Sequence, residues 1–257
     1  MGRTAAASEQ SATTEFDHPS PDSFSDSVAR LLDRLDCRRI DSPDQRDEIF
    51  RLRYRAYLRE GSISANSSGT FADPFDDIGD VYLFGFYIDG ELASSVRVHV
   101  GSSDSPEFPS REVFADLLQP QLDAGKIIVD PTRFVTDENL SRRYRTLSYA
   151  AARLPWLAGL YFNADHLLAA IRVEHQAFYR RTFLHQLLCG PRPYPRLAKP
   201  ISLMTTHCTT VADRVHRRYP FLRSTFFERR MLFDRSVTHP GPPCPRPAIK
   251  DATQGSA

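Results

Sequence analysis

The sequence lacks several features that would point to whole classes of protein. Its 257 residues carry a formal net charge of only +1, so any electrostatic function must be local and no nucleic-acid partner is expected. No apolar run approaches the roughly 20 residues that a membrane-spanning helix needs. The N-terminal segment has no apolar stretch typical of a secretory signal and does not match the myristoylation pattern. We therefore expect a cytoplasmic protein without integral membrane contact.

Cysteine is also sparse. The chain has four cysteines, without a C-x-x-C pair: Cys37, Cys189, Cys208 and Cys244. This pattern favours reduced thiols over a disulfide framework. Two of them lie near His185 and His207, but His207 and Cys208 are adjacent and would alternate across a strand, so both cannot easily face one metal ion. We therefore predict no metal site.

Composition divides the chain into three parts. Residues 1–27 are rich in Ser, Ala, Thr, Asp and Pro, which predicts a disordered arm. Residues 236–257 are rich in proline and predict a disordered tail. The part between them, 28–235, contains no internal repeat and is expected to form a single domain.

The pattern of this domain alternates strands and helices. A helix is expected after the start signal Ser42-Pro43-Asp44, and Asp89-Gly90 joins the strands 81–88 and 91–100 in a hairpin. The remaining expected elements are a helix around residues 114–122, a strand over 126–135, a helix over 141–160, a strand over 166–171, a helix over 174–182, strands over 183–190 and 199–206, and a helix over 209–234. This order predicts an α/β (α+β) fold with a mixed sheet.

Pro131 interrupts the apolar strand 126–135. Proline cannot donate to a sheet ladder and is confined to strand edges, strand starts and bulges. One interpretation is that a strand simply begins at Thr132. The other is a bulge whose unpaired amides face a cleft, where they would polarise a thioester carbonyl.

Four short motifs follow one another between residues 45 and 207. They are Leu52-Arg53-Tyr54-Arg55-Ala56-Tyr57, Asp73-Pro74-Phe75-Asp76, Ser94-Ser95-Val96-Arg97 and Val129-Asp130-Pro131-Thr132-Arg133-Phe134. In this order and spacing they resemble the motifs of N-acyl-homoserine lactone synthases and of the related N-acyl amino acid synthases, which belong to the GNAT acyltransferase superfamily. The resemblance implies a mixed, mostly antiparallel sheet with a splayed strand pair and flanking helices.

The resemblance also implies roles for the residues of these motifs. Asp130, Thr132 and Arg133 match catalytic positions. The positions that match substrate-binding residues are Arg53, Tyr57, Asp73, Asp76, Arg97 and Phe134. The arginines either anchor a substrate carboxylate or hold the two aspartates in bidentate ion pairs. We expect at least one Arg–Asp pair, because so many charges near one cleft need compensation.

Residues 174–183 resemble a helix found in the N-acyl amino acid synthases. In many GNAT enzymes the tyrosine at the position of Tyr179 protonates the departing thiolate, although Tyr179 is equally well interpreted as a packed aromatic residue. His175 is one candidate for the base that deprotonates the attacking amine, and a structural histidine is the other interpretation. Asp130 is the rival base.

The acyl donor is suggested by the stretch 141–146. Many acetyl-CoA enzymes carry a glycine-containing pyrophosphate loop there, whereas this chain has no glycine in it. Because a backbone cradle for pyrophosphate needs glycines, the pattern favours a protein-borne phosphopantetheine over CoA. Five arginines would then dock an acidic acyl carrier protein, or simply form a solvated surface: Arg142, Arg143, Arg145, Arg180 and Arg181.

These interpretations lead to an N-acyl amino acid synthase. It would transfer a long-chain fatty acyl group from acyl carrier protein to the α-amine of an amino acid, without an acyl-enzyme and without a tightly bound cofactor. The 4′-phosphopantetheine arm of the carrier would be the co-substrate. The residues expected to line an acyl tunnel, or else the core, are Phe134, Leu147, Trp156, Phe162 and Phe183.

Three alternatives stay open. A lactone synthase would use S-adenosylmethionine, but the tryptophan usual after the first helix of that group is replaced here by Gly61-Ser62-Ile63. The same scaffold also serves exosortase-associated acyltransferases. A non-catalytic module that binds acyl carrier protein or a lipid is the alternative from a different class.

Overall fold

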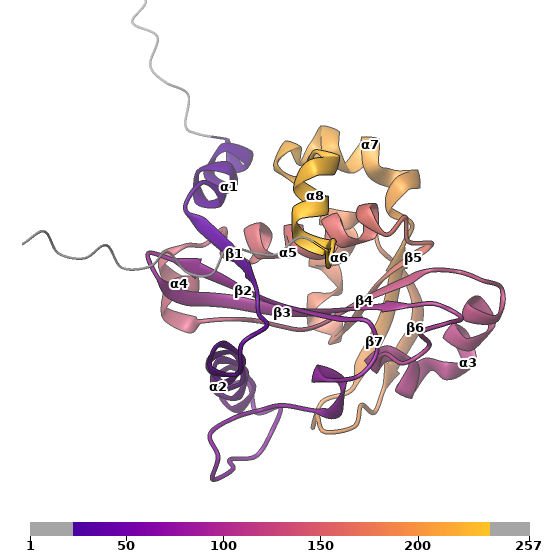
Figure 1. The fold of residues 1–257 in the computed structure, drawn as a ribbon, viewed down its shortest axis with the longest axis horizontal. Coiled ribbons are helices and arrows are strands. Elements are labelled where there is room, and N and C mark those ends of the chain that lie inside the picture. The colour runs from indigo at the N-terminus through magenta and orange to yellow at the C-terminus, as the bar shows by residue number, and fades with distance from the viewer. Residues whose placement is uncertain (1–22, 237–257) are drawn as a thin grey trace, which may run out of the picture.

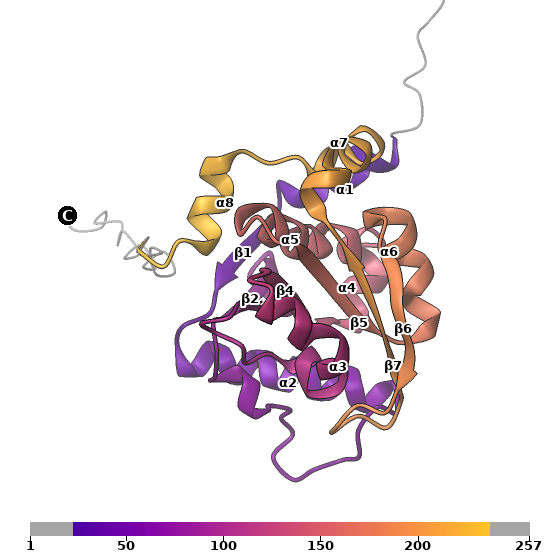
Figure 2. The same ribbon diagram turned by 90° about the vertical axis from the view of Figure 1, so that its right-hand side faces the viewer.

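A computed structural model describes residues 23–236 (Figures 1 and 2). The strands are β1 (Leu35–Arg39), β2 (Val81–Ile88), β3 (Glu91–Gly101), β4 (Ile128–Thr136), β5 (His166–Ile171), β6 (Gln186–Arg192) and β7 (Ile201–Thr206). The α-helices are α1 (Phe24–Leu32), α2 (Pro43–Arg59), α3 (Pro109–Asp123), α4 (Glu138–Arg143), α5 (Leu147–Tyr161), α6 (Gln176–Phe183), α7 (Cys208–Arg218) and α8 (Phe226–Phe233). Short 3-10 turns lie at η1 (Pro74–Asp76), η2 (Val173–His175) and η3 (Pro220–Leu222).

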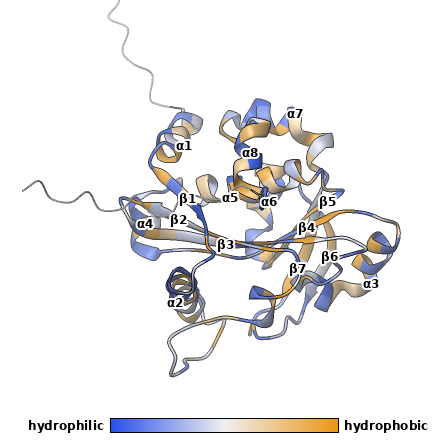
Figure 3. Ribbon diagram, viewed as in Figure 1, coloured by the Kyte–Doolittle hydropathy of each residue, from blue (hydrophilic) through white to orange (hydrophobic). Residues whose placement is uncertain are grey.

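All seven strands belong to one sheet in the order β1-β2-β3-β4-β5-β7-β6. Its neighbouring strands are antiparallel, except that β4 and β5 are parallel. Helix α5 covers one face and α2 and α3 cover the other, while α1, α7 and α8 pack on the outside of α5 (Figure 1). Figure 3 shows the buried α5 as mainly apolar and the half-exposed α2 as mainly hydrophilic. The predicted mixed, mostly antiparallel sheet with flanking helices is confirmed.

Local sequence signals account for the elements that hold the site. The Asp89-Gly90 turn has φ of 52° and 87°, the left-handed conformation that a tight hairpin requires, and it joins β2 to β3 as predicted. The side chain of Ser42 accepts a hydrogen bond from the Gln45 amide and Pro43 occupies the first turn, so α2 begins where the start signal predicts. The strand expected over 166–171 is β5.

Several boundaries differ from the sequence-based prediction. The helix expected over 141–160 is divided into α4 and α5, because Tyr144 leaves the helical region at φ −117° and ψ 84°. The helix expected over 209–234 is likewise divided into α7 and α8. Helix α1 begins at Phe24, so the last residues of the expected arm 1–27 are helical, and strand β1 was not predicted. Residues 1–22 of that arm and 237–257 of the expected tail lie outside the described residues.

Within the described residues, no helix is both long enough and apolar enough to span a bilayer.

Candidate active site

The sheet opens between β4 and β5. Their parallel pairing is confined to Ile128 with His166 and Val129 with Leu167, while β5 continues to pair with β7 as far as Ile171. Pro131 lies at the point of separation, and it lacks the N–H that another ladder bond would need. The predicted splayed strand pair is therefore present, beginning after Val129.

A bulge lies just beyond the separation. Ser95 on β3 faces Val135 of β4, and Arg97 on β3 faces Thr132 of β4. Arg133 and Phe134 of β4 therefore together oppose a single residue of β3, Val96. Arg133 has φ of 55°, a left-handed conformation that is uncommon for a residue with a side chain. Of the two interpretations of the interrupted strand, the bulge is confirmed, although it is centred at Arg133 and not at Pro131.

The opening forms a cleft of about 380 Å³. One wall is β4 from Pro131 to Thr136, and the other includes the end of β5 at Ala170 and Ile171. Tyr57 of α2 and three residues around α6 also line it. Those three are His175, Phe178 and Tyr179. Thr132, Arg133 and Phe134 of the β4 motif thus line the same cleft as Tyr57, His175 and Tyr179.

Tyr179 lies where the cleft narrows. It also lines a small apolar extension of the cleft, together with Phe134, Trp156 and Phe183. Burial raises the pKa of Tyr179 to about 12, and the neighbouring Tyr57 adds to the shift. The phenol therefore stays protonated through the neutral range and can donate a proton. Of the expected tunnel residues, Leu147 and Phe162 are core residues outside the cleft and this extension.

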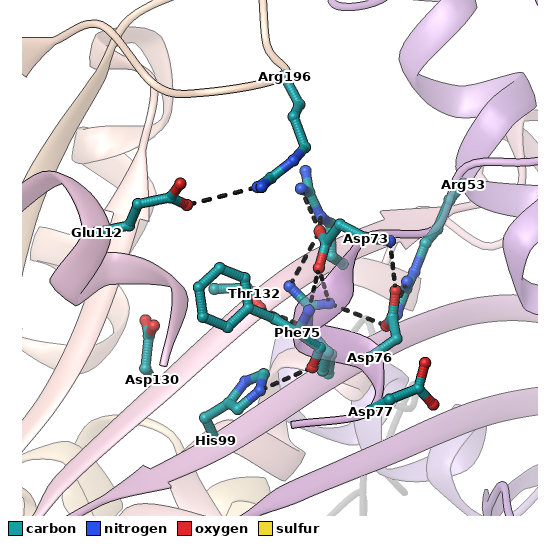
Figure 4. A network of polar contacts seen from close by, with 12 residues as sticks. Arg53, Asp73, Phe75, Asp76, Asp77, His99, Glu112, Asp130, Thr132 and Arg196 are labelled. Carbon is teal, nitrogen blue, oxygen red and sulfur yellow. Dashed lines mark hydrogen bonds and ion pairs between the residues drawn. The ribbon is translucent and has the colours of Figure 1, made fainter. Parts of the chain in front are cut away.

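Beneath the cleft, on the side of α2, lies a buried network of ion pairs (Figure 4). Asp73 accepts from Arg97 at 2.7 and 3.3 Å and from Arg133 Nε at 2.9 Å. Asp76 pairs with Arg53 at 2.8 Å and with Arg97 at 2.9 Å. The expected Arg–Asp pairing is therefore confirmed. Of these five residues only Arg133 lines the cleft, so the structure does not place Arg53, Arg97, Asp73 or Asp76 at a bound substrate.

The network fixes the bulge. Burial alone would favour protonation of Asp73, but hydrogen bonds and charge from Arg97 and Arg133 outweigh it and hold the pKa of Asp73 well below its usual range. Arg97 also donates from Nε to the Thr132 hydroxyl at 3.1 Å. Arg97 and Asp73 thus hold the side chains of Thr132 and Arg133, the two residues that follow Pro131.

Asp130 does not line the cleft. Its carboxylate is fully buried and accepts from the Ser110 amide at 2.9 Å and from the Ser110 hydroxyl at 2.7 Å. Burial raises the pKa of Asp130, and the hydrogen bonds from Ser110 oppose this shift. In this position Asp130 joins β4 to the start of α3, and the arrangement does not favour it as the base for the amine.

His175 lies on the exposed rim of the cleft. Its Nε2 lies 2.9 Å from Nη2 of Arg172, which can only donate, so this nitrogen accepts. With Nε2 occupied and the proton of a neutral imidazole on Nδ1, the ring has no free lone pair to offer an amine. The histidine reaches the cleft as predicted, but the arrangement does not favour it as the base.

Sequence reasoning missed most of the charge at the cleft. Among the described residues, four cationic side chains and one acidic side chain line it: Arg59, Arg133, Arg172, Lys199 and Glu60. Arg172 pairs with Glu60 at 3.0 Å, and Lys199 donates to the Glu60 carbonyl at 2.8 Å. A signal was present, since Arg172 directly follows the strand predicted over 166–171. The excess of cations suits an anionic group on the substrate.

The five arginines expected to dock a carrier are all exposed: Arg142, Arg143, Arg145, Arg180 and Arg181. Arg142 pairs with Glu138 one helical turn away. The other four form no ion pair with any described residue. They belong to α4, α6 and the turn before α5, which adjoin the cleft-lining Ser148 and His175.

Two buried histidines near the site predict that the free energy of unfolding falls at acidic pH. Burial lowers the pKa of His99 and of His185 to about 3, well below the 6.5 of the unfolded chain. Between pH 6.5 and 3 the unfolded state binds more protons, so stability is fully present above pH 6.5 and is lost as the pH falls. We expect urea unfolding to give a free energy that falls from pH 7 to 5 by up to about 1.4 kcal/mol per pH unit for each histidine. His185→Phe should remove about half of this slope, and an equal slope in that variant would contradict the assignment.

The family model described as N-acyl amino acid synthase FeeM matches residues 48–207 of the chain. No curated protein matches the chain significantly.

Solved structures share the fold at low sequence identity. FeeM, an N-acyl amino acid synthase from uncultured soil microbes, has 18% identity, covers 68% of this chain and 92% of its own, and gives a TM-score of 0.56. The AHL synthase LasI has 16% identity over 69% and 92% of the two chains, with a TM-score of 0.51. The CoA-dependent acyl-homoserine lactone synthase BjaI, with MTA, has 17% identity over 76% and 86%, with a TM-score of 0.50. At these identities the likeness establishes the fold.

Proposed function

The chain belongs to the N-acyl amino acid synthase FeeM family and is an acyltransferase, and we propose that it transfers a fatty acyl group from acyl carrier protein to the α-amine of an amino acid. The observation that carries this proposal is the separation of β4 from β5. It opens a cleft between two strands in which an extended pantetheine arm would lie, beside a bulge whose Arg133 side chain pairs with the buried Asp73.

The β4 backbone would polarise the thioester carbonyl. Beyond Val129, the edge of β4 that faces β5 has no strand partner among the described residues. In the proposed reaction the amides at the Arg133 bulge would donate to a carbonyl oxygen and to the oxyanion that forms on attack. Such preorganised donors stabilise the tetrahedral intermediate without any movement during the reaction.

Proton transfers complete the reaction. The amine nitrogen attacks the carbonyl carbon, a C–N bond forms, and the C–S bond breaks as the intermediate collapses. Tyr179 gives its proton to the departing thiolate and regains one from solvent, while the amine loses its proton to water at the open mouth of the cleft. Neither Asp130 nor His175 is assigned the role of base, because neither has a free lone pair that faces the cleft.

The cations at the rim would bind the carboxylate of the amino acid. Asp73 occupies Nε and Nη2 of Arg133. Nη1 of Arg133 forms no hydrogen bond with any described residue, and Arg172 and Lys199 line the same cleft. Arginine suits this role because its planar fork matches a carboxylate. A carboxylate held there would leave the α-amine facing the bulge.

Incubating the protein with acyl carrier protein thioesters and the twenty amino acids, and reading products by mass spectrometry, tests the proposed activity. N-acyl amino acids are the expected products. A homoserine lactone formed from S-adenosylmethionine would instead support the alternative activity, and carrier binding without any product would support a non-catalytic module.

The carrier assignment is tested by reversing charge at Arg143 and Arg145. The Arg143→Glu/Arg145→Glu variant should lower kcat/KM for acyl carrier protein about 10- to 100-fold at low salt, since exposed charges mainly set the rate of encounter. Activity with a free acyl-pantetheine should not change. Arg214→Glu/Arg217→Glu on α7 makes the same charge change away from the cleft and serves as the control. Equal losses in both variants, or the same loss with free acyl-pantetheine in the first, would argue against a carrier docked at α4.

A further inference from the structure

Past Pro131 and Phe134, the cleft continues into a small apolar extension between β5, α5 and α6. Its volume is about 30 Å³, against about 380 Å³ for the cleft itself. This corresponds to roughly two water-sized spheres, which is far less than a long alkyl chain needs. The extension is thus too small for the long acyl chain that the sequence analysis predicts.

Two aromatic rings, those of Trp156 and Phe183, line the extension but not the cleft. The rings of Trp156 and Phe183 stack with centroids 5.9 Å apart and an interplanar angle of 27°. Trp156 is fully buried and Phe183 is 3% exposed, so neither ring can move without repacking the core around α5. An acyl chain that starts at the Arg133 bulge and enters the extension therefore ends against the indole.

The indole is held from behind by another element. Trp156 donates from Nε1 to Nε2 of His216 at 3.1 Å, and the two rings meet edge to face at 5.7 Å. A buried indole N–H needs such a partner, so any rotation of Trp156 costs this hydrogen bond. His216 lies on α7, beyond the residues 48–207 that the family model matches.

We propose that Trp156 is the floor of the acyl site and sets the longest acyl chain that the enzyme transfers, and that His216 is a positioning residue that holds this floor. The inference rests on the proposed function, because it assigns the acyl end of that reaction to this extension. Only three parts of the chain are involved: the indole on α5, its acceptor on α7 and the Phe183 ring at the end of α6.

Competition among carrier thioesters of graded chain length tests the proposal. Trp156→Ala should lengthen the preferred acyl chain by about four carbons, because truncation leaves a cavity at the end of the extension. His216→Leu removes the acceptor and should raise the ratio of long-chain to short-chain product about fivefold, the population change expected from losing one hydrogen bond. His216→Gln can still accept from the indole and should keep the wild-type profile. If Trp156→Ala fails to fold, Trp156→Phe replaces it as the test variant, and a smaller lengthening of the preferred acyl chain is expected.

Fluorescence supplies a readout that needs no turnover. Trp156 is the only tryptophan of the chain, so emission reports on this site alone. Acyl-pantetheine analogues with a non-transferable linkage should leave the emission unchanged while the chain is short, and shift it once the chain reaches the indole. The length at which the emission shifts should match the length at which wild-type activity falls.

The outcomes separate the two proposals. Unchanged chain-length profiles in Trp156→Ala (or Trp156→Phe, if it alone folds) and His216→Leu, from an active wild type, would overturn the floor. If the wild type forms no product with any donor, the proposed function fails. The fluorescence series alone then tests whether Trp156 is the floor of the acyl site. A threshold in chain length then supports the acyl site, and emission that is independent of chain length overturns it.

Discussion

Replacing Asp73 by asparagine lowers the free energy of unfolding by about 3–5 kcal/mol, the usual cost of removing one partner from a buried ion pair. Asp73 is 8% exposed and neutralises two buried guanidinium groups, those of Arg97 and Arg133. Asparagine preserves the shape and can still accept from the Phe75 amide, so the loss reports the missing charge. Chemical denaturation at pH 7 measures it.

Asp77→Asn is the matched control. Asp77 lies four residues further along and pairs with Arg46, but its side chain is 71% exposed. Exposed pairs contribute between 0 and about 1 kcal/mol, so the control should lose little. Equal losses in the two variants would mean that the buried network does not hold the fold. We also expect Asp73→Asn to reduce activity, since Asp73 holds Arg133 in the wall of the cleft.

Tyr179→Phe is expected to lower kcat about 100-fold with natural thioesters, the lower end of what a positioned general acid contributes. Because the pKa of Tyr179 is raised to about 12, the phenol keeps its proton. The wild-type rate should therefore rise with pH as the substrate amine loses its proton, with no descending limb below about pH 10. Steady-state rates between pH 6 and 10 measure both effects.

Two comparisons make this prediction specific. Tyr57→Phe removes the other phenol that lines the cleft beside Tyr179, and it should cost less than about threefold in kcat, the effect of a minor contact. An aryl thioester, whose thiolate leaves without protonation, should restore most of the activity of Tyr179→Phe. A larger loss in Tyr57→Phe, or no rescue by the aryl thioester, would assign the proton donor elsewhere.

Much of the architecture follows from local signals in the sequence. The Asp89-Gly90 turn, the Ser42-Pro43 helix start and the apolar strand 166–171 all appear where they are predicted, because each depends on residues close together in the chain. Strand β1 escaped prediction because it is a short edge strand, Leu-Asp-Cys-Arg-Arg, in which apolar and polar residues alternate over only four positions. The break that ends α4 has no glycine or proline to mark it, whereas Pro220, directly after the C-cap Tyr219, was an available signal for the end of α7.

The site was predictable in part for the same reason. A bulge was one of two interpretations of the motif around Pro131, and the charged motifs indicated Arg–Asp pairs; both features are present, with the bulge at Arg133. The partner of Asp130 is Ser110, twenty residues away on another element, and the partner of Trp156 is His216, sixty residues away. Such contacts depend on how helices dock onto the sheet, and no local pattern encodes them.

The central claim is that the acyl thioester reacts in the opening between β4 and β5. A crystal structure with an acyl-pantetheine analogue of non-transferable linkage tests it most directly. The account predicts the carbonyl carbon between Thr132–Phe134 of β4 and Ala170–Ile171 of β5, with the sulfur position nearest Tyr179. An arm bound instead in the open groove of about 640 Å³ between α1, α5 and α8, with nothing in the strand opening, would contradict it.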